Sequence, residues 1–211
     1  MSAGLTRGVA PEPAAASPPA VAIRCAPMTP ATKRDAETLL GEFLRGDDHY
    51  LASSPAYGDG GSAALVRALD LFLARPDLGF VWLAFADDAY GADGGKGALD
   101  AADTQGTQGT QGTQVPEGTG GATAVGACVV CHAISTSRGT LVAKLDDVTI
   151  PRAWRNRGVG GAMLGTLAAY LRRRGITRVD CGCHRDNAGA WRFYERLGFR
   201  PLDEERIALL L

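Results

Sequence analysis

Residues 155–160 read Arg-Asn-Arg-Gly-Val-Gly, and residues 161–167 continue as Gly-Ala-Met-Leu-Gly-Thr-Leu in a helical pattern. The apolar run Val148-Thr149-Ile150 precedes this stretch and stops at Pro151, which predicts the order strand, glycine-bearing loop, helix. The first turn of a helix presents N–H groups without an internal partner, together with the positive end of the helix dipole. Because glycines let the backbone approach a bulky anion, the stretch is suited to hold a phosphate group.

Two common phosphate-binding motifs do not fit this loop. It lacks the Gly-Lys-Ser/Thr ending of nucleoside triphosphate loops, and it lacks a Gly-x-Gly-x-x-Gly run with a later acidic residue. A plain tight turn is the alternative explanation of the glycines. The loop alone leaves both explanations open.

A second motif follows at residues 187–199, Asn-Ala-Gly-Ala-Trp-Arg-Phe-Tyr-Glu-Arg-Leu-Gly-Phe. Together with the Arg-x-x-Gly-x-Gly run, it resembles the GNAT superfamily of acetyl-CoA-dependent N-acetyltransferases. The first element resembles the pyrophosphate loop of that family, and the second resembles its Asn-x-x-Ala-x-x-Phe-Tyr-x-x-x-Gly-Phe helix. The resemblance is strong over residues 122–201 and weaker over 21–88. It is absent before residue 21 and in residues 89–121.

The resemblance implies an α/β (α+β) GNAT fold, with a mixed central sheet of about six to seven strands flanked by about four helices. The pattern of apolar residues agrees with this order of elements. Helices are expected from Thr29 or Thr32 to Leu44, around residues 65–73, from the glycine loop to about Arg174, and over 187–197. Strands are expected at residues 21–25, 79–86, 124–135, 141–150, 176–183 and 199–211.

The length of 211 residues suits one domain, which we expect to span residues 21–211. Residues 1–20 are rich in proline and alanine and predict a disordered tail rather than a signal peptide. Residues 89–121, rich in Gly, Thr and Gln, predict a disordered insert. The net charge of −1 gives no electrostatic reason to expect nucleic-acid or membrane binding, and we expect a cytoplasmic protein.

The run Cys128-Val-Val-Cys131-His132 matches a haem-attachment pattern, and Cys181 and Cys183 could complete a four-cysteine metal site. However, Cys128 and Cys131 fall in a predicted strand, where residues three apart point to opposite faces. We therefore expect cysteines that pack in the core and no bound metal.

Acetyl-CoA is the co-substrate that the resemblance implies. Backbone N–H groups of roughly Arg157 to Ala162 would bind the diphosphate, and Arg155 and Arg157 would add positive charge. The family resemblance adds that strand residues 148–150 pair with the pantetheine arm and that Asn187 contacts it, although Asn187 also suits a helix N-cap. The expected coenzyme-binding residues are Val148, Thr149, Ile150, Arg155, Asn156, Arg157, Gly158, Val159, Gly160, Gly161, Ala162, Asn187 and Tyr194.

Tyr194 falls at the position where many GNAT members place the acid that protonates the coenzyme thiolate. A phenol can deliver a proton at neutral pH. The alternative role for Tyr194 is aromatic packing beside Trp191 and Phe193.

Asp146 is the candidate general base. Strand alternation would place Asp146 and Asp147 on opposite faces, so that one of them could face the acceptor. The pair is similar to a Glu-Asp pair of the diamine and polyamine acetyltransferase branch. Asp146 is one methylene shorter than glutamate, which favours a water relay over direct proton abstraction. Solvated charge at a strand end is the alternative.

The connection between the first two helices usually borders the acceptor pocket in this family. Here it contains His49, Tyr50 and Tyr57 together with several acidic residues. Acids and aromatic rings suit an ammonium group through Coulomb attraction and cation–π contact. His49 is also an alternative base. A solvated loop fixed by its aromatic residues is the competing interpretation.

These residues lead to one main hypothesis and two alternatives. In the first, a small cationic amine attacks the acetyl thioester directly within a ternary complex. The alternatives are acetylation of a protein or peptide amine, and a non-catalytic module that binds acyl-CoA. An acetyl-cysteine intermediate on Cys181 or Cys183 is less favoured than core packing of these thiols. A homodimer remains open because dimers are common in the family.

Overall fold

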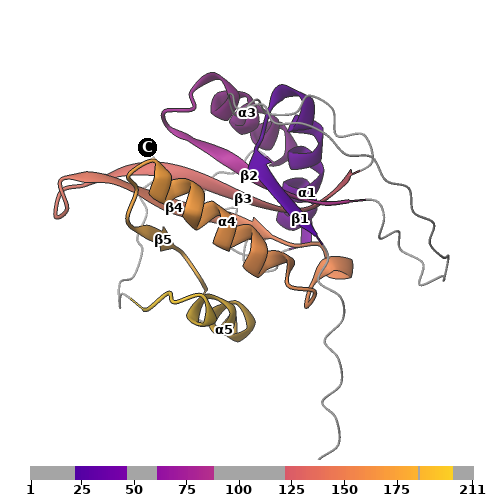
Figure 1. Ribbon diagram of the computed structural model, residues 1–211. Coiled ribbons are helices and arrows are strands. Elements are labelled where there is room, and N and C mark those ends of the chain that lie inside the picture. Colours follow the sequence, from indigo (N-terminus) through magenta and orange to yellow (C-terminus); the bar gives the residue numbers. More distant parts are fainter. Residues whose placement is uncertain (1–21, 47–60, 88–121, 185, 202–211) are drawn as a thin grey trace, which may run out of the picture.

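The computed structural model describes residues 22–46, 61–87, 122–184 and 186–201 (Figure 1). Within these ranges one sheet separates two layers of helices. The strands are β1 (Ile23–Pro27), β2 (Gly79–Asp87), β3 (Ala122–Ser135), β4 (Thr140–Thr149) and β5 (Val179–Cys181). The α-helices are α1 (Lys33–Gly46), α3 (Gly61–Ala74), α4 (Val159–Arg173) and α5 (Ala188–Arg196), with 3-10 turns at Pro30–Thr32 and Arg152–Trp154.

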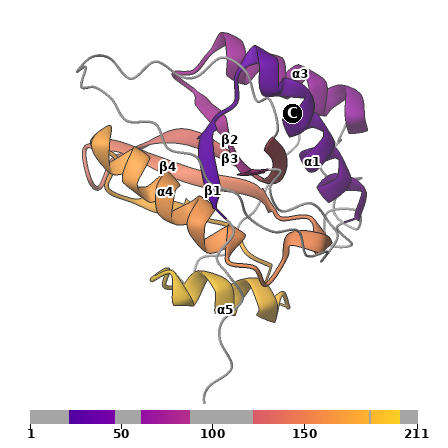
Figure 2. The ribbon, with the colours of Figure 1, turned by 45° about the vertical axis from the view of Figure 1, so that its right-hand side comes forward.

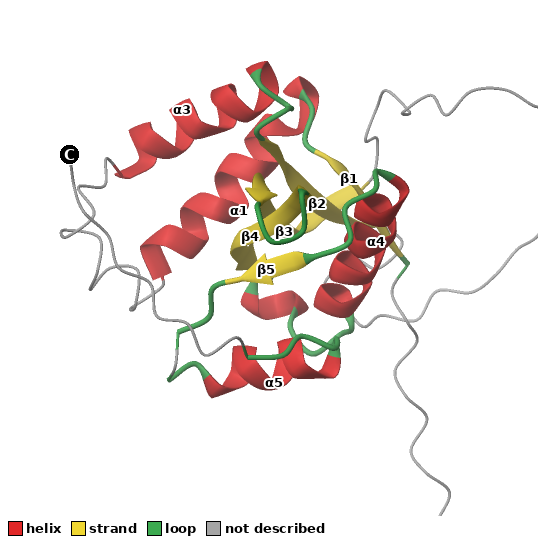
Figure 3. Ribbon diagram, turned by 90° about the vertical axis from the view of Figure 1, so that its left-hand side faces the viewer, coloured by secondary structure: helices red, strands yellow, loops and turns green. Residues whose placement is uncertain are grey.

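The five strands lie in the order β1-β2-β3-β4-β5. The pairs β1–β2, β2–β3 and β3–β4 are antiparallel, whereas β4 and β5 are parallel. The parallel pairing is short, because it runs only from Ala143 opposite Val179 to Leu145 opposite Cys181. Strand β4 continues to Thr149 without further pairing to β5. The two strands therefore part beyond Leu145, at the edge of the sheet seen in Figure 3.

Each face of the sheet carries its own hydrophobic core. In β2, Val81, Leu83 and Phe85 pack under α1 and α3, whereas Trp82 and Ala84 pack with residues of α4. This alternation is the two-residue period of a strand that is buried on both faces. The two helical layers are visible on either side of the sheet in Figure 2.

The cysteines of β3 follow the same alternation. Cys128 is completely buried in the core under α4, and Cys131 packs against the core under α1 and α3. The prediction that these two thiols point to opposite faces is therefore confirmed. A shared ligand site for Cys128 and Cys131 is excluded by this geometry.

Strand β4 contains a β-bulge. Ala127 of β3 pairs with Thr149, but Val129 pairs with Asp146, so that Asp147 and Val148 together oppose Cys128. Asp147 has a φ of 50°, a left-handed backbone that is uncommon for residues other than glycine. The extra residue shifts the alternation of side chains by one position. Leu145 and Val148 are three residues apart, and both contact the core under α4, as does Ile150.

Helix α4 begins and ends as the sequence predicts. Gly158 precedes it with a φ of 81°, and Gly175 follows it with a φ of 76°. At the C-terminal end, the N–H of Ile176 donates to the carbonyl of Leu171 at 3.1 Å, a reversal that satisfies a carbonyl of the last turn.

Most predicted elements are present, with shifted ends. Strand β1 begins and ends two residues later than expected, and β5 covers only Val179–Cys181 instead of residues 176–183. Strand β5 is shorter because Ile176 belongs to the cap of α4 and is buried there. The described part of the predicted last strand, residues 199–201, is not a strand. The rest of it, the predicted tail (1–20) and the predicted insert (89–121) lie outside the described residues.

Gly79 provides a test of this sheet. A Cβ atom at this position would lie 2.2 Å from the carbonyl oxygen of Val130, and the φ of Gly79 is 154°. We expect Gly79→Ala to lower the free energy of unfolding by about 2 kcal/mol or more, because the clash involves backbone. Gly46→Ala is the control, since a Cβ there meets nothing within 4 Å, and we expect a change within about 0.5 kcal/mol. Urea denaturation measures both, and equal stabilities for the two variants would contradict the packing described.

Candidate active site

The candidate site lies where β4 and β5 part. Three features adjoin it: the end of β4 beyond Leu145, the loop that leads into α4, and the residues Phe193 and Tyr194 of α5. Phe193 lies against the start of α4, because a Cβ on Gly160 would come within 3.1 Å of its ring. Tyr194 interacts through its hydroxyl with the thiol of Cys181, the last residue of β5. Adjacent residues of α5 thus contact the start of α4 and the end of β5.

The start of α4 presents unpaired backbone donors. The first bond that closes the helix runs from the N–H of Ala162 to the carbonyl of Gly158 at 3.0 Å. The N–H groups of Val159, Gly160 and Gly161 precede it and have no carbonyl within the helix to accept from them. No side chain caps this end. The arrangement therefore provides the convergent N–H groups that an anion requires.

The glycines of the loop have different roles. A Cβ on Gly158 or Gly161 would meet nothing within 4 Å, so both positions border open space. Gly160 instead faces the ring of Phe193 and allows α4 and α5 to approach each other. The open surroundings of Gly158 and Gly161 leave room for an anion, and the predicted role of the loop glycines in anion binding stays a prediction. Gly160 is a packing residue.

The polar side chains of the loop fix its shape. The Nε of Arg155 donates to the carbonyl of Ile150 at 2.9 Å and ties the loop to the end of β4. The guanidinium of Arg157 lies 5.4 Å from the centre of the Trp154 ring. Asn156 has a φ of 60°, which turns the chain toward α4. All three side chains are exposed, and the two arginines place positive charge beside the helix start.

The ring of Tyr194 packs against aromatic residues, and its hydroxyl makes a polar contact. Its ring lies 5.3 Å from the rings of Phe193 and Phe199, against the core under α4. Burial, reinforced by the neighbouring thiols of Cys181 and Cys128, raises the pKa of Tyr194 well above its usual value. The phenol therefore keeps its proton throughout the neutral range.

Asn187 is the N-cap of α5. Its Oδ1 accepts a hydrogen bond from the N–H of Ala190 at 3.0 Å. The capping role considered for this residue is thus present, and it sets the start of the helix that carries Tyr194.

Asp146 lies on the face of the sheet covered by α1 and α3. It pairs with Val129, whose side chain belongs to the core on that face, and directly paired residues of antiparallel strands point to the same side. The Nζ of Lys144 lies 3.5 Å from Oδ2 of Asp146, and both side chains are about one third exposed, at 35% and 34%. Asp146 and Tyr194 consequently lie on opposite faces of the sheet.

The bulge changes one expectation. The sequence predicts Asp146 and Asp147 on opposite faces of a regular strand. The bulge at Asp147 interrupts the regular strand, so that this rule does not apply to the pair. The pairing with Val129 assigns Asp146 to its face independently of that rule.

The other predicted acceptor-binding residues, His49, Tyr50 and Tyr57, lie outside the described residues. Across the described part of the chain, no three His, Cys, Asp or Glu side chains come together as a metal site. None of the helices in that part is long and apolar enough to cross a membrane.

Three contacts of the site were not identified from the sequence: Gly160 with Phe193, Tyr194 with Cys181, and Lys144 with Asp146. A signal existed for the last, because residues two apart on a strand share a face. The other two join segments far apart in the sequence, and no local pattern marks them.

Comparison with known proteins agrees with this geometry. Residues 117–199 match the model of the acetyltransferase (GNAT) family. A stretch of 69 residues is 33% identical to an uncharacterised N-acetyltransferase of Methanocaldococcus jannaschii. That stretch is 33% of this chain and spans only 30% of the relative.

Solved acetyltransferase structures share the fold over most of the chain. An aminoglycoside N-acetyltransferase in complex with CoA aligns with a TM-score of 0.58 and 13% identity, covering 93% of this chain and 98% of that one. An acetyltransferase of Trypanosoma brucei aligns with a TM-score of 0.54 and 17% identity, covering 90% and 100%. At such identities the likeness establishes the GNAT fold, with its mixed sheet and helices on both faces.

Proposed function

We propose that this protein transfers the acetyl group of acetyl-CoA to a primary amine, with a small cationic amine as the preferred acceptor. The observation that carries the proposal is the edge of β4 that has no β5 partner beyond Leu145, near the open helix start at Gly158 and the hydroxyl of Tyr194. The match to the GNAT acetyltransferase family supports the acyl transfer, and the CoA complex of a protein with the same fold supports the co-substrate.

The residues present fit the diphosphate of CoA. The unpaired N–H groups of Val159, Gly160 and Gly161 would donate to it, and the open surroundings of Gly158 and Gly161 leave room for it. Arg155 and Arg157 would add charge attraction. The end of β4 at Val148 and Thr149 has no β5 partner, so its backbone can pair with the pantetheine arm. When bound, acetyl-CoA supplies a thioester carbonyl activated for attack.

Acetyl transfer requires a neutral amine nitrogen to attack that carbonyl. The nitrogen forms the new C–N bond, the C–S bond breaks, and the sulfur leaves with the electron pair. Asp146 would accept the surplus proton of the nitrogen through a water molecule, since its side chain is short. Tyr194 would donate its proton to the departing sulfur. Asp146 and Tyr194 lie on opposite faces of the sheet, so that separate groups would serve the nitrogen and the sulfur, the two substituents of the tetrahedral carbon.

The raised pKa of Tyr194 has two consequences for this step. The phenol stays protonated at every pH where the enzyme would work, so the donor is always in its active form. It is also a weaker acid than a free phenol, so its proton moves only as charge builds on the sulfur.

Direct attack is favoured over an acetyl-cysteine intermediate. Burial raises the pKa of the Cys181 thiol and that of the Cys183 thiol. The thiolate is the nucleophilic form of cysteine, so a raised pKa makes both residues poor acyl acceptors at neutral pH.

The preference for a cationic amine rests on the acidic and aromatic residues expected around the acceptor. His49, Tyr50, Tyr57 and Asp146 are the proposed acceptor-binding residues. The ammonium of Lys144 opposes the attraction of Asp146 for a cation, which leaves the acids and rings of residues 47–60 to provide most of the binding.

Gly161→Glu tests the coenzyme site and the activity together. We expect the wild-type protein to release CoA thiol from acetyl-CoA only when an amine from a panel of polyamines, aminoglycosides, amino acids and peptides is added. Gly161→Glu should weaken CoA binding by at least about a hundredfold, because the new carboxylate fills and repels the diphosphate position. Gly165→Glu, one turn further along α4 and also in open space, is the control.

Thiol release and calorimetry with CoA measure these effects. Equal CoA affinity in the Gly161 and Gly165 variants would refute the placement of the diphosphate. CoA binding by wild type without amine-dependent thiol release would favour the non-catalytic module, and release with peptide amines alone would favour a peptide acetyltransferase.

Tyr194→Phe tests the proton donor. We expect kcat to fall by about a hundredfold or more while CoA affinity changes less than about twofold, because the ring contacts are kept and only the hydroxyl is lost. Tyr170→Phe, which also removes a hydroxyl from the core under α4 but far from the site, should leave kcat unchanged. Because the pKa of Tyr194 is raised, the wild-type kcat should show no loss from its ionisation up to about pH 10. Wild-type turnover in the Tyr194→Phe variant would contradict the role of Tyr194 as proton donor.

Asp146→Asn tests the proton acceptor. We expect kcat to fall by about a hundredfold with little change in CoA affinity, since an amide cannot take the proton of the nitrogen. Asp180→Asn is the control, because Asp180 on β5 is similarly exposed at 31% and is also ion-paired, to Arg178 at 3.1 Å. Steady-state kinetics measure kcat of both variants. Similar kcat values for Asp146→Asn and Asp180→Asn would show that another group, such as His49, accepts the proton.

A further inference from the structure

The face of the sheet opposite α4 carries a row of four charged side chains where β4 and β5 part. Lys144 and Asp146 of β4 are two residues apart and share this face. Asp180 of β5 is paired with Lys144 and points to the same face, because the residues on either side of Asp180 contact the core under α4. Arg178 completes the row through its ion pair with Asp180. All four side chains are about one third exposed, so a ligand can reach them.

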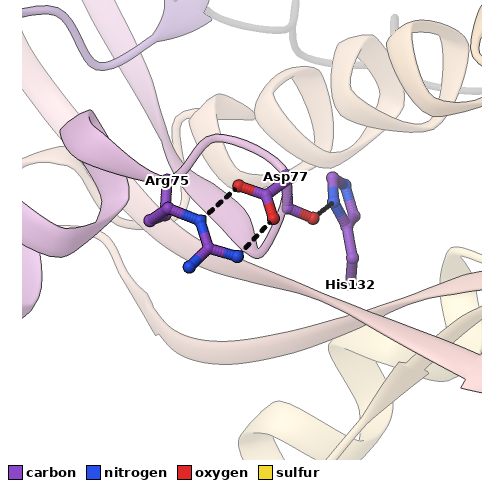
Figure 4. Close-up of polar contacts among 3 residues, drawn as sticks. All are labelled: Arg75, Asp77 and His132. Atoms are coloured by element: carbon purple, nitrogen blue, oxygen red, sulfur yellow. Dashed lines mark hydrogen bonds and ion pairs between the residues drawn. The ribbon is translucent and has the colours of Figure 1, made fainter.

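Two ion pairs between residues two apart in the sequence are closed by direct hydrogen bonds. Arg75 donates to both carboxylate oxygens of Asp77 at 2.8 and 2.7 Å, and the backbone carbonyl of Asp77 lies 3.0 Å from Nδ1 of His132 (Figure 4). Nη2 of Arg178 donates to Oδ2 of Asp180 at 3.1 Å. In both pairs the guanidinium satisfies the carboxylate directly.

The ion pair of Lys144 and Asp146 is more open. The Nζ of Lys144 lies 3.5 Å from Oδ2 of Asp146, which exceeds the roughly 2.8 Å of a charge-assisted hydrogen bond. An ammonium group has three N–H donors, and among the described residues no hydrogen bond of the Lys144 ammonium is found. The pair can therefore take an acceptor at Lys144 and a donor at Asp146 without losing a hydrogen bond.

These two charges stand on an apolar part of the sheet. Lys144 is paired with Cys131 and Asp146 with Val129, and both partners lie in or against the core under α1 and α3. Burial, reinforced by the Asp146 carboxylate, raises the pKa of the Cys131 thiol. Because water is excluded from one side of the pair, its attraction for the charges of a ligand is stronger than on a fully exposed surface.

The position of Lys144 has a consequence for the acceptor. If Asp146 takes the proton through a water molecule, the acceptor nitrogen lies one water away from its carboxylate, where Lys144 repels a plain cationic amine. A carboxylate on the carbon that bears the amine turns this repulsion into attraction. In an α-amino acid the nitrogen and the nearer carboxylate oxygen are roughly 3 Å apart. This spacing is close to the 3.5 Å between Nζ of Lys144 and Oδ2 of Asp146.

We propose that the acceptor is a free α-amino acid, whose carboxylate binds Lys144 while its nitrogen faces the water next to Asp146. The inference rests on the proposed acetyl transfer and makes Lys144 a specificity-determining residue for that reaction. The cationic amine of the proposed function is then the ammonium group of the amino acid.

The reaction leaves the carboxylate of the amino acid unchanged. The ammonium gives one proton to water before the attack and a second to Asp146 as the bond between nitrogen and the acetyl carbon forms. The bond between carbon and sulfur breaks, and the sulfur receives a proton from Tyr194, which regains it from water. The products are an N-acetyl amino acid and CoA as the free thiol.

A comparison of amino acids with their amides tests the proposal on the wild-type protein. The common L-amino acids are first assayed by CoA thiol release, and the best acceptor is then compared with its own amide, which lacks only the negative charge. We expect kcat/KM to be about tenfold higher for the amino acid. The amide has the more acidic ammonium, so a preference for the acid comes from its carboxylate. Equal values, or a preference for the amide, would overturn the proposal.

Variants of Lys144 assign this preference to its ammonium. Lys144→Met should raise KM for the amino acid about tenfold and lower KM for the amide, because attraction and repulsion are both lost. Lys144→Arg should keep most of the preference, since a guanidinium also binds a carboxylate. Lys33→Met removes an ammonium paired with Asp70 of α3 and is the control, with both KM values unchanged. A preference that persists in Lys144→Met, or loss of activity with both acceptors, would contradict the proposal.

The failure of this inference is distinguishable from failure of the proposed function. Thiol release with polyamines or aminoglycosides, but with no free amino acid, would overturn the assignment of Lys144 and leave acetyl transfer to an amine intact. Absence of thiol release with every class of amine would overturn the proposed function and the inference together.

Discussion

The extra residue in β4 is the constraint on which the candidate site depends. A regular strand would continue to pair with β5, and the edge of β4 would be closed. The left-handed backbone at Asp147 bends β4 away after Leu145 and leaves β5 to end at Cys181. The same bend delivers the chain to the glycine loop, so that the open strand edge and the start of α4 lie together. The bulge at Asp147 therefore accompanies both the unpaired edge of β4 and the approach of the chain to the start of α4.

Local sequence was sufficient for the elements that border the site. The glycines around α4, the cap at Asn187 and the apolar run at residues 79–86 each act over a few residues, and the elements that they predict are present. The bulge also left a signal. On the α4 face of β4 the apolar residues are Ala143, Leu145, Val148 and Ile150, and the step of three between Leu145 and Val148 marks one residue too many.

The sequence does not show which contacts form between segments that are distant along the chain. Strand β5 is short because Ile176 belongs to the cap of α4. The apolar pattern of residues 176–183 does not show that the helix cap and the strand compete for this residue. The thiol beside Tyr194 and the carbonyl beside His132 come from strands and turns many residues away. Burial and such contacts are why the raised pKa of Tyr194 emerges only from the folded chain.

The contact between Gly160 and Phe193 has a consequence for dynamics. Helix α5 is short and mostly exposed, and its hold on the domain passes through Phe193, Tyr194 and Phe199. Local unfolding of such a segment requires much less free energy than unfolding of the whole domain. If α5 detaches, the phenol leaves and the start of α4 loses its aromatic support in a single event. Amides of α5 and of the first turn of α4 would then exchange with solvent in step, and ligand at the helix start would slow both.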